Sequence, residues 1–286
     1  KKPLMIVVVA AIALSLGVPI GLDMLDVRVK SPKGVIKIIG HPPLAALLEQ
    51  SDNLAVQRVR ADQLRRLAIA MDRERQAHGN HIILMTSVKP GAGVTDLAFE
   101  MAHELSEMGV RALVVEANPF KPDPRYSTES MRPGLLDLLV ENIDAIEAVS
   151  PASQRLPERI GVGFALDPHL FAYPRLRQRL DELKALYDVI ILDSPPLLMS
   201  GDTEYLAGIS DVSLLLIGSG QVGPGELRRA ADILQKVNPP VIGFILTHMT
   251  IFKGGGYFAK QVEEYEAAEA KARASLNLHP LNNPPA

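Results

Sequence analysis

A glycine-rich segment between residues 86 and 96 has the composition of a phosphate-binding loop. Gly91 and Gly93 stand two positions apart, and Thr95 follows at the expected start of a helix. Glycines let backbone N–H groups approach a phosphate closely, and the amides at a helix N-terminus attract anions. A threonine hydroxyl at this point can hold Mg²⁺. We therefore predict that Gly91, Gly93 and Thr95 are cofactor-binding residues, with ATP and Mg²⁺ as the cofactors.

The residue between Gly93 and Thr95 departs from this chemistry. In the P-loop pattern a lysine stands there and reaches the outer phosphates. This chain has Val94 instead, and Val88 occupies the place of the opening glycine. Loss of one charge-assisted hydrogen bond weakens binding by about 1.5–3 kcal/mol. We therefore expect ATP and Mg²⁺ to bind weakly or not at all, and we do not expect efficient phosphoryl transfer.

Lys89 is the nearest cation that can compensate for this loss. It lies five positions before Val94, where partition-type ATPases carry a second lysine that reaches across a dimer. Lys89 is therefore a further candidate for cofactor binding, acting on a neighbouring protomer. The alternative is a loop lysine that is simply solvated.

Two acidic residues close apolar runs farther along the chain. Glu116 follows the run 111–115, and Asp193 ends the run that begins after Asp188. An acid at the end of a buried strand, opposite a phosphate loop, is the second magnesium-handling element of such folds. We therefore predict that Thr95, Asp193 and Glu116 are the metal ligands. If the chain is an active enzyme, Asp193 and Glu116 are also its catalytic residues.

Strands and helices alternate around these residues. Short apolar runs are typical of buried parallel strands, and five occur, at 82–86, 111–115, 188–192, 212–217 and 241–246. Helical stretches separate them, at about 95–108, 173–186, 203–209 and 223–236. This order predicts an α/β fold with a P-loop NTPase-like, doubly wound, mainly parallel sheet.

The N-terminal residues predict a membrane anchor before this domain. Leu4 to Leu22 is a run of 19 residues without a charge, and as a helix it would span about 28 Å, close to one hydrocarbon core. A secretory signal peptide is the alternative, but the run is long for one and no small-x-small cleavage pattern follows. More basic residues follow the run than precede it, so the positive-inside rule predicts an inner-membrane protein with its main domain in the cytoplasm.

The chain is therefore expected to have four parts. They are a transmembrane helix over 1–24, a juxtamembrane linker with helices over 25–80, the α/β domain over 81–250, and a tail over 251–286. Within the linker, one short helix is expected between Ser31 and Gly40 and a longer one over 52–77. The tail is predicted to be helical up to residue 276.

Composition excludes several other classes of function. The net charge is -3 and gives no sign of nucleic-acid binding, which usually needs a basic face, so no nucleic-acid partner is expected. The chain has no cysteine, so disulfides, thiolate metal sites and cysteine nucleophiles are excluded.

With these motifs in place, the chain resembles the bacterial tyrosine kinases (BY-kinases) that are fused to, or paired with, polysaccharide co-polymerases, the chain-length determinants. The segment from Tyr187 to Pro196 is similar to the family's Walker B segment. The segment from Leu113 to Pro122 is similar to a second acidic segment, Asp-x-Asp-x-Arg-x-Pro. The proline-rich stretch before Leu44 is similar to the junction that follows the second membrane helix.

The chain also departs from the family pattern. Besides Val94, Asn118 replaces the second carboxylate of the acidic segment, and Thr247 stands where an asparagine usually contacts the base. The family's oligomerisation motif, Glu-x-x-Arg-x-x-Arg, is reduced to the segment from Asp62 to Ala68. Of the tyrosine-rich tail only Tyr257 and Tyr265 remain.

The resemblance and the departures together imply a degenerate member, a pseudokinase-like module of a membrane polysaccharide co-polymerase. Its expected partners are further copies of itself in a homo-oligomer, the polysaccharide polymerase and export machinery, and the membrane. Its expected role is to regulate the chain length, assembly or export of an exopolysaccharide. Two alternatives stay open at this point, an active atypical tyrosine kinase or ATPase that uses Lys89, and a membrane-tethered partition-type ATPase that positions a synthase complex.

Overall fold

The computed structural model describes residues 27–126, 132–141, 143–153, 156–164, 175–251, 256 and 258–277. Within these residues, seven strands form one parallel sheet in the order β1-β7-β6-β2-β5-β3-β4. The strands are β1 (Ala45–Leu48), β2 (Ile82–Ser87), β3 (Ala112–Glu116), β4 (Glu158–Ile160), β5 (Val189–Asp193), β6 (Val212–Gly218) and β7 (Val241–Met249). The predicted α/β class and P-loop NTPase-like sheet are confirmed.

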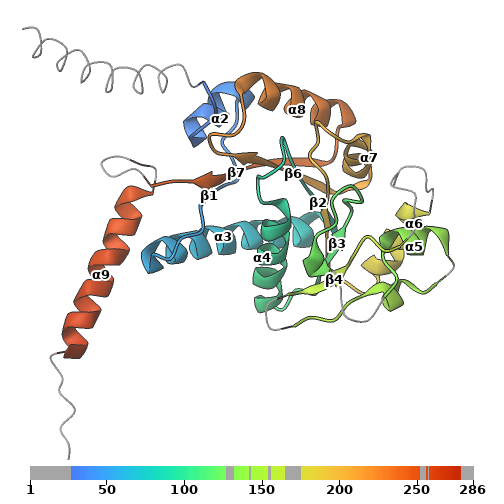
Figure 1. Cartoon of the computed structure of the whole chain (residues 1–286), viewed down its shortest axis with the longest axis horizontal. Coiled ribbons are helices and arrows are strands. Elements are labelled where there is room, and N and C mark those ends of the chain that lie inside the picture. Colours follow the sequence, from blue (N-terminus) through green and yellow to red (C-terminus); the bar gives the residue numbers. More distant parts are fainter. Residues whose placement is uncertain are drawn as a thin grey trace, which may run out of the picture.

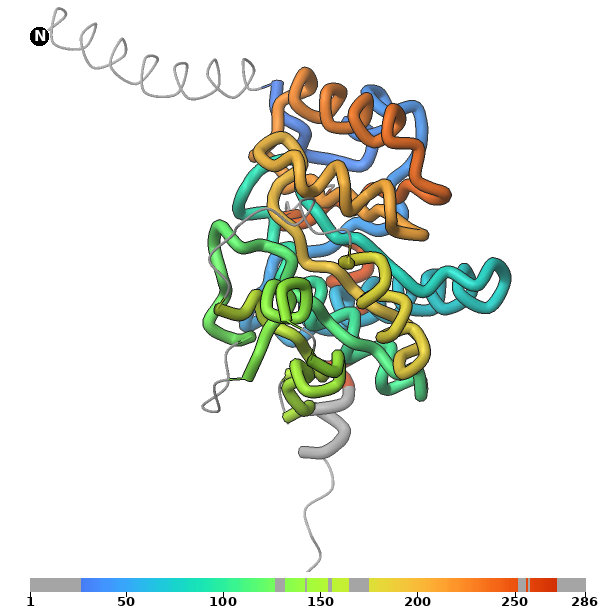
Figure 2. The backbone as a smooth tube through the Cα atoms, turned by 90° about the vertical axis from the view of Figure 1, so that its right-hand side faces the viewer, coloured from blue at the N-terminus to red at the C-terminus, as the bar shows by residue number. Residues whose placement is uncertain are grey.

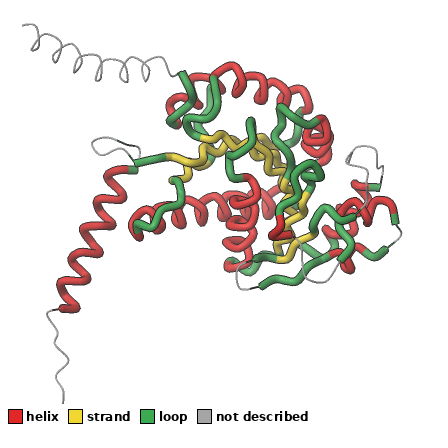
Figure 3. Tube along the Cα trace, viewed as in Figure 1, coloured by secondary structure: helices red, strands yellow, loops and turns green. Residues whose placement is uncertain are grey.

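Helices lie on both faces of this sheet, as Figures 1 and 3 show. The α-helices are α2 (Pro32–Ile39), α3 (Leu54–His78), α4 (Val94–Glu107), α5 (Leu135–Val140), α6 (Leu176–Lys184), α7 (Gly201–Ile209), α8 (Pro224–Val237) and α9 (Ala259–Asn277). Two short 3-10 turns are η1 (Pro124–Tyr126) and η2 (Ala145–Ala148). The strands and helices expected from the sequence are therefore present, with ends shifted by a few residues.

Burial on both faces explains why the strand sequences are apolar without interruption. Ile83 and Met85 of β2 pack on the side of α3 and α4. Ile82 and Leu84 point to the other face, where α7 and α8 pack. Successive side chains of a strand point to opposite faces, so a strand covered on both sides needs apolar residues at every position.

The segment before β2 takes part in the sheet. β1 pairs in parallel with β7, with Ala45 opposite Ile245, and all four β1 residues are buried. We expected this stretch to be linker and helices. The strand was not predicted because four residues that closely follow Pro42 and Pro43 give too short a pattern to indicate a strand. β4, with Glu158 and Arg159 among its three residues, was missed for the same reason.

Helix ends follow the local capping chemistry. Ser31 caps α2 by accepting a hydrogen bond from the N–H of Gly34 at 3.3 Å, with Pro32 in the first turn and Gly40 in the left-handed conformation at the end. α2 lies beside α8, as Figures 1 and 2 show from two directions. α9 packs on α3, where Asn53 donates to Glu266 at 2.8 Å.

No helix in the described ranges combines the length and the apolar character needed to cross a bilayer. The predicted transmembrane helix, residues 1–24, lies outside the described residues. Tyr257 of the tail also lies outside them, whereas Tyr265 lies partly exposed on α9.

Candidate functional site

The cleft that holds most of the predicted site opens at the carboxyl edge of the sheet. It has a volume of about 640 Å³ and is lined by the loop before α4, the loop after β3 and the loop after β5. Gly91, Gly93, Thr95 and Asp193, four of the candidate site residues, line it. Ligands of open α/β sheets bind at this edge, because the loops that follow parallel strands meet there.

The loop between β2 and α4 has the conformation of an anion cradle. Gly91 and Gly93 have φ angles of 89° and 79°, which only glycine adopts without strain. A Cβ on Gly93 would also meet His248 Cε1 at 3.4 Å. The first amides of α4 have no acceptor within the helix and are available to a phosphate. These features fit the phosphate groups of a nucleotide.

Thr247 fastens this loop to the neighbouring strand. Its hydroxyl, at the end of β7, donates to the carbonyl of Ala92 at 2.9 Å. The sequence singled out Thr247 only as a departure from an asparagine that contacts the base. In the structure its side chain is buried and sets the path of the phosphate loop.

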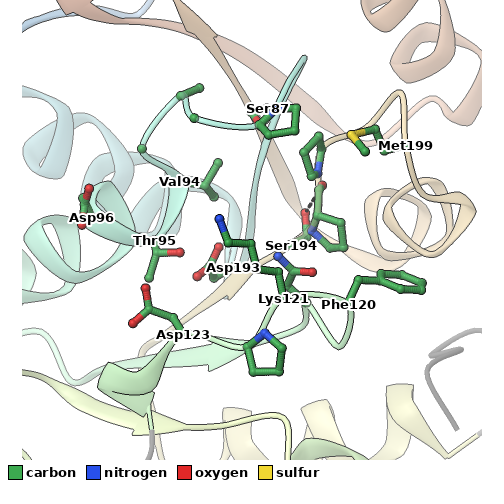
Figure 4. Close-up of a pocket in the computed structure, with 18 of the residues that line it drawn as sticks. Ser87, Val94, Thr95, Asp96, Phe120, Lys121, Asp123, Asp193, Ser194 and Met199 are labelled. Carbon is green, nitrogen blue, oxygen red and sulfur yellow. Dashed lines mark hydrogen bonds between the residues drawn. The ribbon is translucent and has the colours of Figure 1, made fainter.

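Val94 is the first residue of α4 and lines the cleft. Its side chain is partly buried and packs against the apolar cluster under α3 and α4. Figure 4 shows it beside Thr95, facing the cleft. An aliphatic group therefore stands where a P-loop presents its lysine.

Lys89 does not line the cleft. Its ammonium forms an ion pair of 2.9 Å with Glu226 at the start of α8, and Glu226 also accepts from the N–H of Gly223. Both side chains are more than 40% exposed. A role for Lys89 at the phosphates of a neighbouring protomer would require this pair to open.

Asp193 is the buried acid of the cleft. One of its carboxylate oxygens accepts from the hydroxyl of Tyr126 at 2.9 Å, and the Thr95 hydroxyl donates to the carboxylate as well. Burial raises its pKa to about 6, although both hydrogen bonds act in the opposite direction. The hydroxyl of Thr95 and the carboxylate of Asp193 are oxygen ligands of the kind that Mg²⁺ accepts.

Glu116 lies opposite Asp193 in the sheet register, but it does not line the cleft. Its two carboxylate oxygens accept from the backbone N–H groups of Asp123 and Val162. Burial raises its pKa to about 7. In this arrangement Glu116 braces the loop after β3 and holds it against the loop after β4.

Several polar residues of this cleft were not predicted from the sequence. Arg125 pairs with Asp96 at 2.6 Å and with Asp123 at 2.8 Å, and it lies over the ring of Phe99. Lys121 also lines the cleft. Lys121 could have been noticed in the sequence, because it is a cation next to Pro122 in the acidic segment. Arg125 and Asp96 are far apart in the chain, so no local pattern predicted their pairing.

Within the described part of the chain, no three histidine or acidic side chains come together as a metal site. Thr95 and Asp193 supply two oxygen ligands, which fits a magnesium ion that takes its other ligands from nucleotide phosphates.

Comparison with known proteins gives one family model and a set of related kinases. Residues 80–218 match the family model described as an AAA domain. The chain is 29% identical over 189 residues to "Putative tyrosine-protein kinase EpsB" of Ralstonia solanacearum, a match that covers 64% of this chain and 25% of that protein. It is 24% identical over 180 residues to "Tyrosine-protein kinase YwqD" of Bacillus subtilis, covering 61% and 75%. The chain thus spans about a quarter of the length of EpsB.

Solved structures agree on the fold. "The kinase domain of Escherichia coli tyrosine kinase ETK" superposes with a TM-score of 0.70 at 19% identity, covering 80% of this chain and 97% of that one. The "BceF Tyrosine Kinase Domain" gives 0.66 at 22%, covering 77% and 99%. At these identities the likeness establishes the arrangement of strands and helices.

Proposed function

We propose that this chain is a kinase-like module that binds nucleotide but does not transfer phosphate efficiently. By its AAA domain and its relatives, the chain is a member of the bacterial tyrosine-kinase family. By its resemblance to kinases associated with polysaccharide co-polymerases, we assign it to the assembly of an exopolysaccharide machine at the inner membrane. In this proposal its main domain faces the cytoplasm and works as a homo-oligomer.

The observation that carries this proposal is Val94 at the first position of α4. The lysine of a P-loop neutralises charge that develops on the transferred phosphoryl group, so its loss lowers the rate more than it lowers the affinity. Lys89 is held by Glu226, and Glu116 is held by two backbone amides. In this arrangement neither Lys89 nor Glu116 is placed to act on a phosphoryl group, and Val94 carries no charge.

The remaining residues suit binding. The amides of the loop around Gly91 and Gly93 would hold the phosphates, and Thr95 with Asp193 would hold Mg²⁺. Bound magnesium would supply charge neutralisation at the phosphates. A bound nucleotide would order the loops after β2, β3 and β5 together. The module could then change conformation when nucleotide binds, without phosphoryl transfer.

The test is an assay of phosphoryl transfer with the full chain. Purified protein with radiolabelled ATP and Mg²⁺ is expected to release no phosphate above buffer and to leave Tyr257 and Tyr265 unlabelled. Measurable turnover that disappears in Asp193→Asn would overturn the proposal, because it would show that the cleft is catalytic. A Lys89→Ala variant then tells whether such turnover depends on Lys89.

A further inference from the structure

The cleft has a second wall that carries a cation opposite Val94. This wall is the loop that follows β3, from Asn118 to Arg125. Lys121 belongs to it and lines the cleft. Figure 4 shows its side chain extending into the cleft, with the amine directed toward Val94, Thr95 and Asp193. The ammonium thus faces the space in which a P-loop lysine would hold the outer phosphates.

The other cations near the cleft are already engaged. Arg125 is shared between Asp96 and Asp123, and Lys89 pairs with Glu226. The charge of Lys121 contributes to the lowered pKa of the neighbouring Asp123, but no carboxylate of the described residues forms an ion pair with Lys121. Its position leaves the charge of Lys121 available to an anionic ligand in the cleft.

We propose that Lys121 is the phosphate-binding cation of this cleft and replaces the lysine that is missing at position 94. The ligand is a nucleotide whose outer phosphates lie between the amides at the start of α4 and the ammonium of Lys121. This inference rests on the proposed nucleotide binding and deepens it by naming the residue that recognises the phosphates.

The same placement explains binding without efficient chemistry. Lys121 is exposed and belongs to a loop, whereas a P-loop lysine is fixed by the first turn of a helix. A lysine ammonium on a four-carbon stem is strongly hydrated and flexible. Such a cation contributes affinity, but stabilisation of a transition state needs a charge that is held in place before the reaction.

The experiment measures the affinity of the full chain for MgATP in wild type and in Lys121→Ala, by calorimetry. Loss of a charge-assisted contact weakens binding by about ten- to hundredfold. Lys236→Ala is the matched control, because Lys236 is an exposed lysine in the last turn of α8, at the opposite edge of the sheet. Its affinity for MgATP is expected to equal that of wild type.

A double variant, Lys121→Ala with Val94→Lys, tests whether a lysine at position 94 can bind the phosphates in place of Lys121. It is expected to recover most of the affinity lost in Lys121→Ala, because the lysine returns to the first turn of α4. Lys121 is exposed, so the single variant should unfold at the wild-type temperature, and a loss of binding cannot then be attributed to unfolding.

Two results would overturn the inference. One is a Lys121→Ala affinity equal to that of wild type, and the other is a wild type that does not bind MgATP at millimolar concentration. Neither result depends on catalysis. Phosphate release by the wild type would contradict the proposed function and leave the role of Lys121 intact.

Discussion

At the scale of single residues, two buried acids lie at the carboxyl edge of the sheet, and the cleft beside Asp193 lacks its expected cation. Asp193 and Glu116 are both 3% exposed, and burial is the largest cause of the upward shift of each pKa. A carboxylate with a raised pKa favours proton uptake in the folded state. Both acids therefore destabilise the folded protein when they are ionised.

The pH dependence of stability follows from these shifts. The pKa of Asp193 rises from 3.8 to about 6, and that of Glu116 from 4.5 to about 7. The folded protein then holds more protons than the unfolded chain between about pH 4 and about pH 7. The stability that these groups contribute is present below about pH 4 and is lost as the pH rises through their folded pKa values.

Asp193→Asn isolates one of these groups. Asparagine does not ionise, so the variant should gain stability relative to wild type as the pH rises from about 4 to about 6, on top of a constant loss from weaker hydrogen bonds to Tyr126 and Thr95. Urea denaturation of both proteins across this range is the measurement. Two stability curves that run parallel with pH would mean that Asp193 does not titrate as the structure implies.

At the scale of elements, a few side chains join loops to strands. Thr247 ties the end of β7 to the phosphate loop through the carbonyl of Ala92. Thr203 of α7 makes a similar bond, to the carbonyl of Pro195 at 3.0 Å. The two bonds differ in one respect, because the Pro195 carbonyl also accepts from Thr86 at 2.7 Å.

This difference gives a matched pair of substitutions. Thr247→Val leaves the Ala92 carbonyl without its side-chain donor and should lower the free energy of unfolding by about 1–2 kcal/mol. Thr203→Val should cost less, because Thr86 still serves the Pro195 carbonyl. Chemical denaturation of both variants checks this order. If Thr203→Val proved the more damaging change, the phosphate loop would not depend on Thr247 as we infer.

At the scale of the whole molecule, the segment before residue 81 is part of the domain. β1 covers the edge of β7, and α3 places Leu64, Leu67 and Met71 in the cluster beneath α4. Removal of these elements would expose a strand edge together with apolar surface, and this combination promotes aggregation.

A truncation tests the boundary. A chain that begins at residue 81 is expected to be largely insoluble, or to unfold well below the temperature at which a chain that begins at residue 27 unfolds. The soluble fraction after expression and the thermal unfolding midpoint are the measurements. Equal solubility and equal midpoints would show that residues 27–80 are dispensable and act as a linker, as the sequence suggested.

Five of the seven strands, the phosphate loop and the place of Asp193 were predicted from the sequence, because these depend on local patterns. Five apolar runs, a glycine turn and an acid at a strand end each fit within a short stretch of chain. The same local pattern identified Val94 as the departure. Short β1 and β4 escaped prediction, since a strand of three or four residues is decided by the strand it pairs with.

The distribution of charges around the cleft depends on tertiary contacts. Lys89 pairs with Glu226 of α8, Tyr126 donates to Asp193 from another loop, and Lys121 points across the cleft toward Val94. These contacts join residues that are distant in sequence, so they depend on the packing of several elements at once. For that reason the missing lysine was visible in the sequence, and the residue that we propose in its place became visible only in the fold.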